Sequence, residues 1–387
     1  MPNAGKSSLF NALTKAGAEA ANYPFTTIEP NVAVVPVVDD RLTQVAELVR
    51  SSEIVWDTIA FHDIAGLVAG ASKGEGLGNQ FLANIRETDA LVHVVRAHGD
   101  PNVIHSEGSV DPARDIDTIE TELIYADLEQ AERRHMKVVR EARGGDRRAI
   151  AEEQWLRAVI EALQSGRPAR SVPVPEDAPE VVRTLQPLTS KPVLFVANVD
   201  EGSDEIPAAV AEHARSQGAG VVAISSRIEA ELSELDDEDA AAMRADLGVS
   251  ESGLQRVVRG AFELLELDTF FTAGEATIAQ CWHLRRGLTA WHAAGEIHTD
   301  IQKGFVRAEV IGWKELVDAG GYAPARDRGT LRVEGRVYEN RYVIWGRMSW
   351  GLLREYEVYE DTQASKALDA YLEERPPGRT ERAEGAF

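Results

Sequence analysis

Apolar residues recur with two different periods along the first 266 positions of the chain. Short apolar runs typical of buried strands alternate with stretches that have the 3.6-residue spacing of amphipathic helices. Strands are predicted at 32–37, 54–64, 90–95, 192–198 and 221–224, and helices at 41–48, 208–217 and 254–265. Strands that alternate with helices in this way predict a parallel α/β sheet.

The segment 115–164 has a different pattern, helical and strongly charged. An acidic first part leads into the basic cluster Arg133–Arg148, and Gly144-Gly145 marks a turn before a return helix at 147–163. Two long antiparallel helices are the simplest interpretation, with the basic cluster near their tip. Most such charge runs are solvated faces, and a nucleic-acid contact is the alternative.

From residue 268 short strands and turns dominate, which predicts a small separate β-rich domain. The predicted division has four parts: a core domain at 1–114 and 186–266, an inserted helical domain at 115–185, a C-terminal domain at 267–350, and a disordered or divergent tail at 351–387.

The composition indicates a globular, cytoplasmic protein. The 387 residues suggest two or three domains, and a hydrophobic fraction of 44% is enough to bury a core. Neither a membrane span nor a signal peptide is predicted, and the single cysteine, Cys281, fits a reducing compartment. The formal charge of −23 argues against general coating of nucleic acid but leaves room for a local basic face.

The residues Pro2–Ser8 match the second half of a phosphate-binding P-loop, G-x-x-x-x-G-K-[S/T]. In such a loop Lys6 reaches the phosphates, the Ser7 hydroxyl ligates Mg²⁺, and backbone N–H groups cradle the anion. The predicted nucleotide-binding residues here are Asn3, Ala4, Gly5, Lys6, Ser7 and Ser8. The first Gly of the motif and its strand would stand before Met1. A mis-assigned start is therefore expected, and a longer chain is predicted to fold or bind nucleotide better.

Three further motifs follow in the order that a P-loop nucleotidase requires. Asp63-Ile64-Ala65-Gly66 is a D-x-x-G at a strand end, where the Asp holds metal-bound water and the Gly senses the γ-phosphate. Asn198-Val199-Asp200-Glu201 and Ser225-Ser226-Arg227 end two later strands, where base-contacting loops belong. Thr27 lies where a switch threonine would complete the metal shell, although a simple turn hydroxyl fits its spacing equally well.

Four segments together resemble the Obg-like ATPases of YchF type: 22–31, 63–68, 71–79 and 297–300. The resemblance spans about residues 2–309. It implies an α/β fold with a Ras-like P-loop domain, an inserted helical coiled-coil domain and a C-terminal α+β TGS domain of β-grasp type. It also implies ATP hydrolysis and association with ribosomes. The expected partners are ATP and the ribosome, as its large subunit or the whole particle, with its RNA; the expected cofactor is Mg²⁺, and a monomer that binds no membrane is expected.

The sequence departs from that of GTPases at the residues that read the base and at the residue that orients the attacking water. Glu201 replaces the Asp that pairs with guanine, and Val199 replaces the neighbouring Lys, so guanine reading is impaired. In the family this pattern accompanies a preference for ATP. Leu67 cannot orient water as a Gln would, and the resemblance gives that role to His105. In related enzymes an Asn that corresponds to Asn3 coordinates K⁺, so K⁺ is a second candidate ion beside Mg²⁺.

The resemblance places RNA or ribosome contacts in the C-terminal domain, with Arg285, Arg286, Lys303 and Arg307 available. The end of that domain, 342–350, does not match the family pattern, so its last strand is uncertain. Two other functions remain open from the sequence: a GTPase of the wider Obg group, and a ribosome-binding adaptor without hydrolysis.

Overall fold

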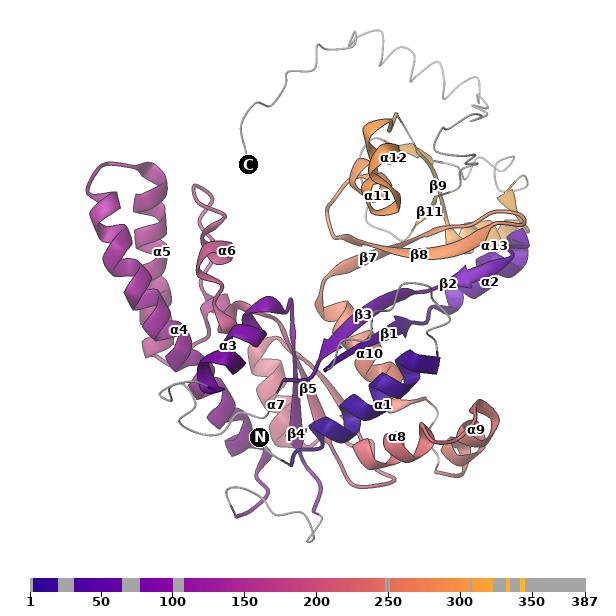
Figure 1. The fold of residues 1–387 in the computed structure, drawn as a ribbon, viewed down its shortest axis with the longest axis horizontal. Coiled ribbons are helices and arrows are strands. Elements are labelled where there is room, and N and C mark those ends of the chain that lie inside the picture. Colours follow the sequence, from indigo (N-terminus) through magenta and orange to yellow (C-terminus); the bar gives the residue numbers. More distant parts are fainter. Residues whose placement is uncertain are drawn as a thin grey trace.

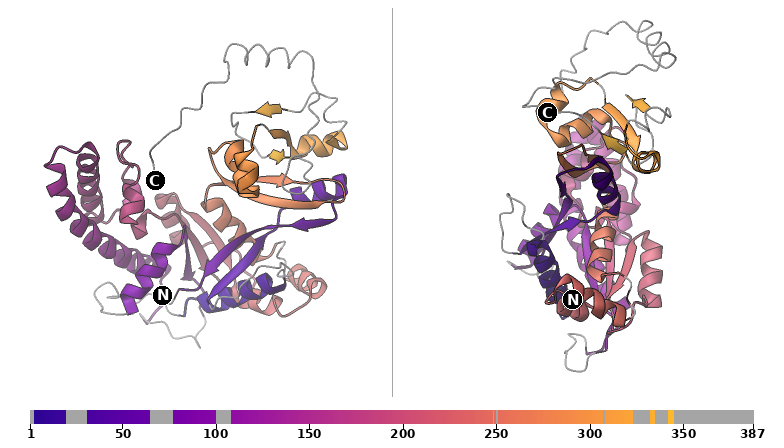
Figure 2. Two further views of the ribbon diagram at one scale, coloured as in Figure 1. Left: turned by 45° about the horizontal axis from the view of Figure 1, so that its top comes forward. Right: turned by 90° about the vertical axis from the view of Figure 1, so that its right-hand side faces the viewer.

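The structure is a computed structural model that describes residues 3–19, 31–64, 77–99, 108–247, 249, 251–306, 308–322, 332–334 and 342–344. A central α/β unit carries a long helical hairpin on one side and a second sheet on the other (Figure 1). Figure 2 shows the same separation after rotation. Within the described ranges no helix has both the length and the apolar character needed to cross a membrane.

The central unit contains two strand ladders. The first is parallel, in the order β4 (Leu91–Arg96), β5 (Val193–Asn198), β6 (Gly220–Ile224), and the second pairs β1 (Val32–Val37) with β3 (Asp57–His62) antiparallel. The predicted parallel α/β sheet is thus confirmed for β4–β6, with an antiparallel pair beside it.

Helices cover both faces of this unit because their apolar stripes face the strands. α1 (Lys6–Glu19) and α10 (Gly253–Leu264) bury Leu13 and Val257 in a cluster with Val35 and Val196. On the other face α7 (Ala208–Gln217) packs against Phe195. The resulting three layers bring the loops that follow β5 and β6 to the same edge as the loop before α1.

The two long antiparallel helices predicted from the charge pattern are confirmed as α4 (Pro112–Ala142) and α5 (Arg147–Gln164). Asp146 caps α5 by accepting from the backbone N–H groups of Arg148 and Ala149 at 2.8 and 3.2 Å. At the base of the hairpin the buried Asp127 carboxylate accepts from the N–H groups of Leu188 and Thr189 at 2.8 and 2.7 Å. These bonds fix the hairpin to the central unit.

The C-terminal sheet has the order β10-β9-β11-β7-β8-β2. Its strands are β7 (Leu267–Thr272), β8 (Ile278–Arg285), β9 (Ala308–Gly312), β10 (Arg332–Glu334) and β11 (Tyr342–Ile344), and its helices are α11 (Ala290–Ile297), α12 (Thr299–Lys303) and α13 (Trp313–Ala319). The predicted α+β C-terminal domain is confirmed. The strand in doubt, β11, lies between β9 and β7.

One strand of this sheet comes from the N-terminal part of the chain. β2 (Glu53–Val55) pairs parallel with β8, and α2 (Asp40–Val49) buries Leu42 and Val45 against Phe271. The prediction of one continuous strand at 54–64 was therefore wrong. The chain leaves one sheet and enters the other at Trp56, and the strand-like pattern of residues 54–64 does not reveal that change of partner.

The remaining helices connect these units. They are α3 (Leu77–Glu87), α6 (Val181–Leu185), α8 (Ser226–Leu232) and α9 (Asp237–Asp246), with short 3-10 turns at Ala169–Ser171 and Leu188–Ser190.

Candidate functional site

The Asn198 side chain joins the loop before α1 to the loop that follows β6. Its Nδ2 donates to the carbonyl of Ala4 at 3.0 Å, and its Oδ1 accepts from the backbone N–H of Ser226 at 2.9 Å. The side chain is 3% exposed, so both bonds form away from water. The predicted phosphate loop and both predicted base loops therefore meet at one point, held by a single amide.

Gly5 is required at its position by both conformation and space. Its φ is +94°, and a Cβ placed there would lie 2.2 Å from Asn198 Nδ2 and 2.6 Å from Ser226 Oγ. No side chain fits such a distance, and L residues rarely adopt that φ. The glycine of the G-K-S sequence is thus what allows the loop to lie against Asn198.

The start of α1 combines an anion site with a candidate metal site. Lys6 forms an ion pair with Asp63, which follows β3 and donates its backbone N–H to the carbonyl of Asn31 at 2.8 Å. Ser7 and Ser8 are exposed in the first turn of α1. The first backbone N–H groups of a helix have no partner within it and favour negative charge. Phosphate oxygens are the ligands that such a helix start suits.

The oxygens at this position fit Mg²⁺. Ser7 offers a hydroxyl and Asp63 a carboxylate, and both are hard oxygen ligands. Among the residues that the structure describes, no group of three or more His, Cys, Asp and Glu could hold a metal by itself. A Mg²⁺ ion bound here would take further ligands from phosphate and water, which is how Mg²⁺ usually binds.

The base-side loop contains an ion pair that the sequence did not predict. Glu201 Oε1 lies 2.9 Å from Arg227 Nη1, and both side chains are about half exposed or more. Arg227 also pairs with Glu231 at 3.2 Å, one helical turn further along α8. Val199 is buried, with its N–H bonded to the carbonyl of Ile224 at 2.8 Å. The carboxylate that replaces the guanine-reading Asp thus already has a cationic partner.

Glu229 begins the acidic segment 229–239, whose composition is typical of a protein surface, but its side chain is buried. The side chain is 6% exposed and accepts from Ser252 Oγ at 3.0 Å and the N–H of Gly253 at 2.7 Å. It therefore caps the start of α10, where a negative charge is favourable. The acidic composition around it conceals this buried role.

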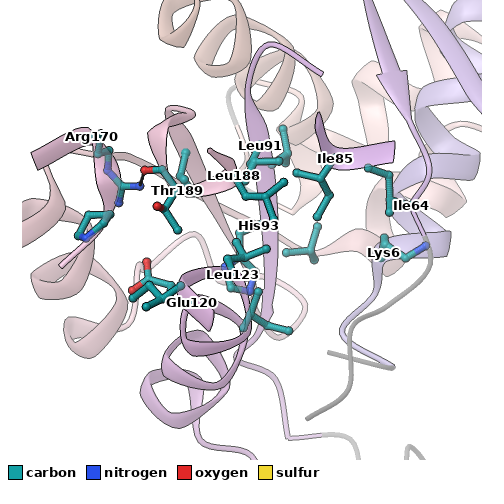
Figure 3. A pocket seen from close by; sticks show the side chains of 16 residues that line it. Lys6, Ile64, Ile85, Leu91, His93, Glu120, Leu123, Arg170, Leu188 and Thr189 are labelled. Carbon is teal, nitrogen blue, oxygen red and sulfur yellow. Dashed lines mark hydrogen bonds between the residues drawn. The ribbon is translucent and has the colours of Figure 1, made fainter. Parts of the chain in front are cut away.

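A cavity of about 150 Å³ lies between β4, α3, α4 and the start of α1. Figure 3 shows Lys6 and Ile64 at one end, Arg170 and Glu120 at the other, and mainly apolar side chains between them. Burial lowers the pKa of His93, which lines it, to about 3, so this imidazole stays neutral. Such a lining does not suit phosphate, so the loop cluster around Asn198 is the better candidate for a nucleotide site.

Three predicted site residues, Thr27, Gly66 and His105, lie outside the described residues, as do Leu67 and Arg307. Their roles stay predictions. The structure brings the described site residues together in three groups. Ala4 and Gly5 lie against Asn198 and Ser226, Lys6 pairs with Asp63, and Glu201 pairs with Arg227. Ser225 stands at the N-terminal end of α8, and Asn3 adopts a positive φ of 57°.

Comparisons with known proteins give consistent matches along the chain. A family model for a 50S ribosome-binding GTPase matches residues 1–138, and the model for the C-terminal region of YchF GTPases, described as a protein of unknown function, matches residues 267–342.

Full-length relatives show the same similarity. The ribosome-binding ATPase YchF of Bacillus subtilis is 46% identical over 344 residues, with 87% of this chain and 94% of that protein covered. The protein of that name from Haemophilus influenzae is 48% identical over 341 residues, with the same coverage. The solved structure of the Schizosaccharomyces pombe YchF GTPase superimposes with a TM-score of 0.79 at 32% identity, covering 89% of this chain and 95% of that one.

Proposed function

This chain belongs to the YchF family, and from that premise we propose that it binds and hydrolyses ATP in the cytoplasm and associates with ribosomes according to its nucleotide state. The relatives are named ribosome-binding ATPases, and the fold and loop order of this chain match theirs.

The observation that carries the proposal is the bridge made by Asn198. It holds the loop before α1 against the loop after β6, so that a phosphate at Lys6 and a base near Glu201 can belong to one nucleotide. Nucleotides bind at the carboxyl ends of strands in sheets of this kind.

Each residue of the phosphate side then has a task. Lys6 exchanges its ion pair with Asp63 for the β- and γ-phosphates, and the N–H groups at the start of α1 hold phosphate oxygens. Ser7, Asp63 and Thr27 would hold Mg²⁺, and Asn3 is the candidate ligand for K⁺. A bound Mg²⁺ offsets phosphate charge during transfer.

Water attack and base choice are assigned to two further groups. His105 orients the attacking water, because Leu67 stands where a Gln would do so in a GTPase. Glu201, longer than the usual Asp and paired with Arg227, disfavours guanine and leaves ATP as the substrate.

Two substitutions test the enzyme. Lys6→Ala is expected to abolish ATP hydrolysis and weaken ATP binding, whereas Lys15→Ala is the matched control, because Lys15 lies on the same helix but pairs with Glu234. His105→Ala is expected to remove turnover while sparing ATP affinity. Turnover that survives in either Lys6→Ala or His105→Ala would remove that residue from the proposed mechanism.

A GTPase is the second candidate, because both matching family models and the yeast structure carry that name. Competition of unlabelled ATP and GTP against one labelled nucleotide separates the two. Tighter binding of GTP than of ATP would reject the ATPase assignment, and pelleting of the protein with ribosomes tests the second half of the proposal.

A further inference from the structure

We propose that the cavity between β4, α3 and α4 binds a small neutral aromatic molecule with one hydroxyl group, and that this molecule weakens nucleotide binding. Phenol is the simplest member of the class. Its ring matches the apolar walls of the cavity, and its O–H matches the polar side chain in their midst, His93. Binding of the ring does not depend on the proposed ATPase function, whereas the effect on nucleotides rests on it.

The walls of the cavity come from one face of β4 and from the two helices that cover it. Alternate residues of a strand point to opposite faces, and Val92 and Val94 pack toward α1, so His93 points toward α3 and α4. The helices contribute Ile85 from α3 and Leu123 from α4, which are 5% and 7% exposed. Branched aliphatic side chains of this kind form an apolar surface that suits a ring.

The volume of the cavity suits a single ring. It measures about 150 Å³, and apolar protein cavities of about this size bind benzene. A water molecule is held in such a place only where it finds about two to four polar partners, which mainly aliphatic walls do not offer. A ring contacts several walls at once, and each contact adds a small dispersion energy. An aromatic molecule is therefore a better occupant than water.

His93 supplies the polar contact that selects a hydroxyl group. Figure 3 shows it in the middle of the cavity, between Lys6 at one end and Arg170 and Glu120 at the other. Because burial lowers the pKa of His93 to about 3, the ring is neutral, with one N–H donor and one acceptor nitrogen. In the part of the chain that the structure covers, neither ring nitrogen forms a hydrogen bond. A hydroxyl group both donates and accepts, so it can bond either nitrogen.

Aromatic contacts hold the His93 ring from behind. Its centroid lies 5.5 Å from that of Phe195, at an interplanar angle of 40°. Phe195 is fully buried and meets the ring of His213 edge-on, with the centroids 5.4 Å apart. These contacts limit the movement of the imidazole. A polar group that is already oriented binds its partner at a lower entropic cost.

The charged groups at the Arg170 end already have partners, which favours a neutral ligand. The Arg170 guanidinium donates to the carbonyl of Thr189 at 3.1 Å and to Gln217 Oε1 at 2.8 Å. Glu120 Oε1 lies 3.1 Å from His213 Nε2. A carboxylate beside the neutral imidazole would be buried without a cation of its own, and Glu120 would repel it. A hydroxyl group carries no such cost.

The other end of the cavity adjoins the candidate phosphate site, because Lys6 and Ile64 form its wall. In this arrangement Lys6 pairs with Asp63. Under the proposed function Lys6 leaves that pair to reach the phosphates, and its side chain then no longer covers this end. A molecule in the cavity therefore binds the arrangement with the Lys6–Asp63 pair better, and by linkage it lowers the affinity for ATP.

The test uses phenol as the probe, with benzene and benzoate as comparison molecules. Binding to the full chain is measured by ligand-detected NMR titration, and the circular dichroism spectrum reports the fold. His93→Phe keeps a ring but removes both nitrogens, and Ile85→Phe narrows the cavity. Ile160→Phe is the matched control, because it makes the same change on α5, outside the cavity. Leu123→Phe narrows the cavity from α4 and takes the place of Ile85→Phe if that variant does not fold.

Phenol is expected to bind the wild type with a dissociation constant on the order of 1 mM, since so small a ligand makes few contacts. His93→Phe is expected to bind phenol about fivefold more weakly, because one hydrogen bond is lost, and benzene within about twofold of wild type. Ile85→Phe is expected to bind both molecules at least about tenfold more weakly, because its added atoms occupy their space. Ile160→Phe is expected to match the wild type within about twofold. Benzoate is expected not to bind.

The effect on nucleotides is measured by titration with a fluorescent ATP analogue, with and without saturating phenol. Phenol is expected to raise the dissociation constant of the analogue at least about threefold in the wild type. In Ile85→Phe, at the same concentration of phenol, the constant is expected to stay unchanged. An equal rise in both proteins would show that phenol acts elsewhere and would reject the link to the cavity.

Absence of phenol binding would overturn the proposal, as would equal affinity in wild type, Ile85→Phe and Leu123→Phe. If His93→Phe loses affinity for phenol and benzene alike, His93 does not select the hydroxyl group. Tighter binding of benzoate than of phenol would indicate an anion site at Arg170 instead. An unchanged ATP affinity at saturating phenol would reject the effect on nucleotides. If the wild type binds phenol but no nucleotide, the proposed ATPase function and the effect that rests on it both fail, and the phenol site stands.

Discussion

Removing the Asn198 side chain should disable nucleotide binding more than any surface substitution near it. In Asn198→Ala the carbonyl of Ala4 and the N–H of Ser226 both lose their partner, and both residues are almost fully buried. A buried polar group left unsatisfied costs about 1–3 kcal/mol, so the two together cost about 2–6 kcal/mol. Proteins have a free energy of unfolding of only about 5–15 kcal/mol, so this loss is large.

The loss should appear in both stability and affinity, because the same amide holds the phosphate loop to the base loop. Urea unfolding at pH 7.5 should show the destabilisation, and titration with a fluorescent ATP analogue should show a dissociation constant at least about tenfold higher, equivalent to about 1.4 kcal/mol. Asn198→Asp is the informative second variant. It keeps an acceptor for Ser226 but buries a carboxylate with one oxygen against the carbonyl of Ala4, so it should destabilise the protein at pH 7.5 at least as much as Asn198→Ala does.

Asn11→Ala is the matched control, since Asn11 is exposed on α1, and surface changes of this kind alter stability by less than about 0.5 kcal/mol. The reasoning is refuted if Asn198→Ala binds ATP within twofold of wild type. It is also refuted if Asn198→Ala and Asn11→Ala have the same urea midpoint.

Two further substitutions test the base side and the contact between the sheets. Arg227→Ala releases the Glu201 carboxylate to accept the N–H groups of guanine, so the preference for ATP over GTP should fall in a competition titration. The free energy of unfolding should change by less than about 1 kcal/mol, because the pair is exposed. An unchanged ratio of ATP to GTP affinity would contradict this role of Arg227. His283 Nδ1 lies 2.7 Å from Asp57 Oδ2, and this hydrogen bond raises the pKa of His283, so its stabilisation is complete below about pH 6.5 and is lost as pH rises through the raised pKa. The difference in melting temperature between wild type and His283→Gln should therefore be larger at pH 6 than at pH 9, and a constant difference would reject the interaction.

Local patterns in the sequence predicted much of this fold. The apolar runs predicted β4, β5 and β6, and the charged helical pattern with its Gly-Gly turn predicted α4 and α5. The order of the motifs predicted that the strand ends carrying Lys6, Asp63, Asn198 and Ser226 lie close together, and the structure pairs Lys6 with Asp63 and Asn198 with Ser226, while their roles in nucleotide binding stay predictions. These predictions succeeded because each depends on spacing within a few residues, or on the chain order of strand ends.

The buried polar contacts could not be predicted in the same way. Glu229 lies in an acidic stretch, so composition favours the surface, and its burial is explained by the hydrogen bonds that it accepts from Ser252 and Gly253 at the start of α10. The pairing of Arg227 with Glu201 joins loops that are 26 positions apart in the sequence. No periodicity carries information about such partners, because they are set by which strands become neighbours.

The path of the chain between β1 and β3 shows how strand pairing connects the candidate site to the C-terminal sheet. The two strands pair along their full length, but between Val37 and Asp57 the chain contributes α2 and β2 to the C-terminal sheet. β3 therefore starts at Asp57, bonded to His283 of that sheet, and leads to Asp63, paired with Lys6. At about 3.3 Å per residue, the backbone at Asp57 and the backbone at Asp63, just after the strand, are about 20 Å apart. Sequence motifs identified the carboxylate at the phosphate end and the β-rich C-terminal domain as separate features. The strand pairing shows that one short segment, paired with β1 along its length, runs from the contact with His283 to the candidate phosphate site at Asp63.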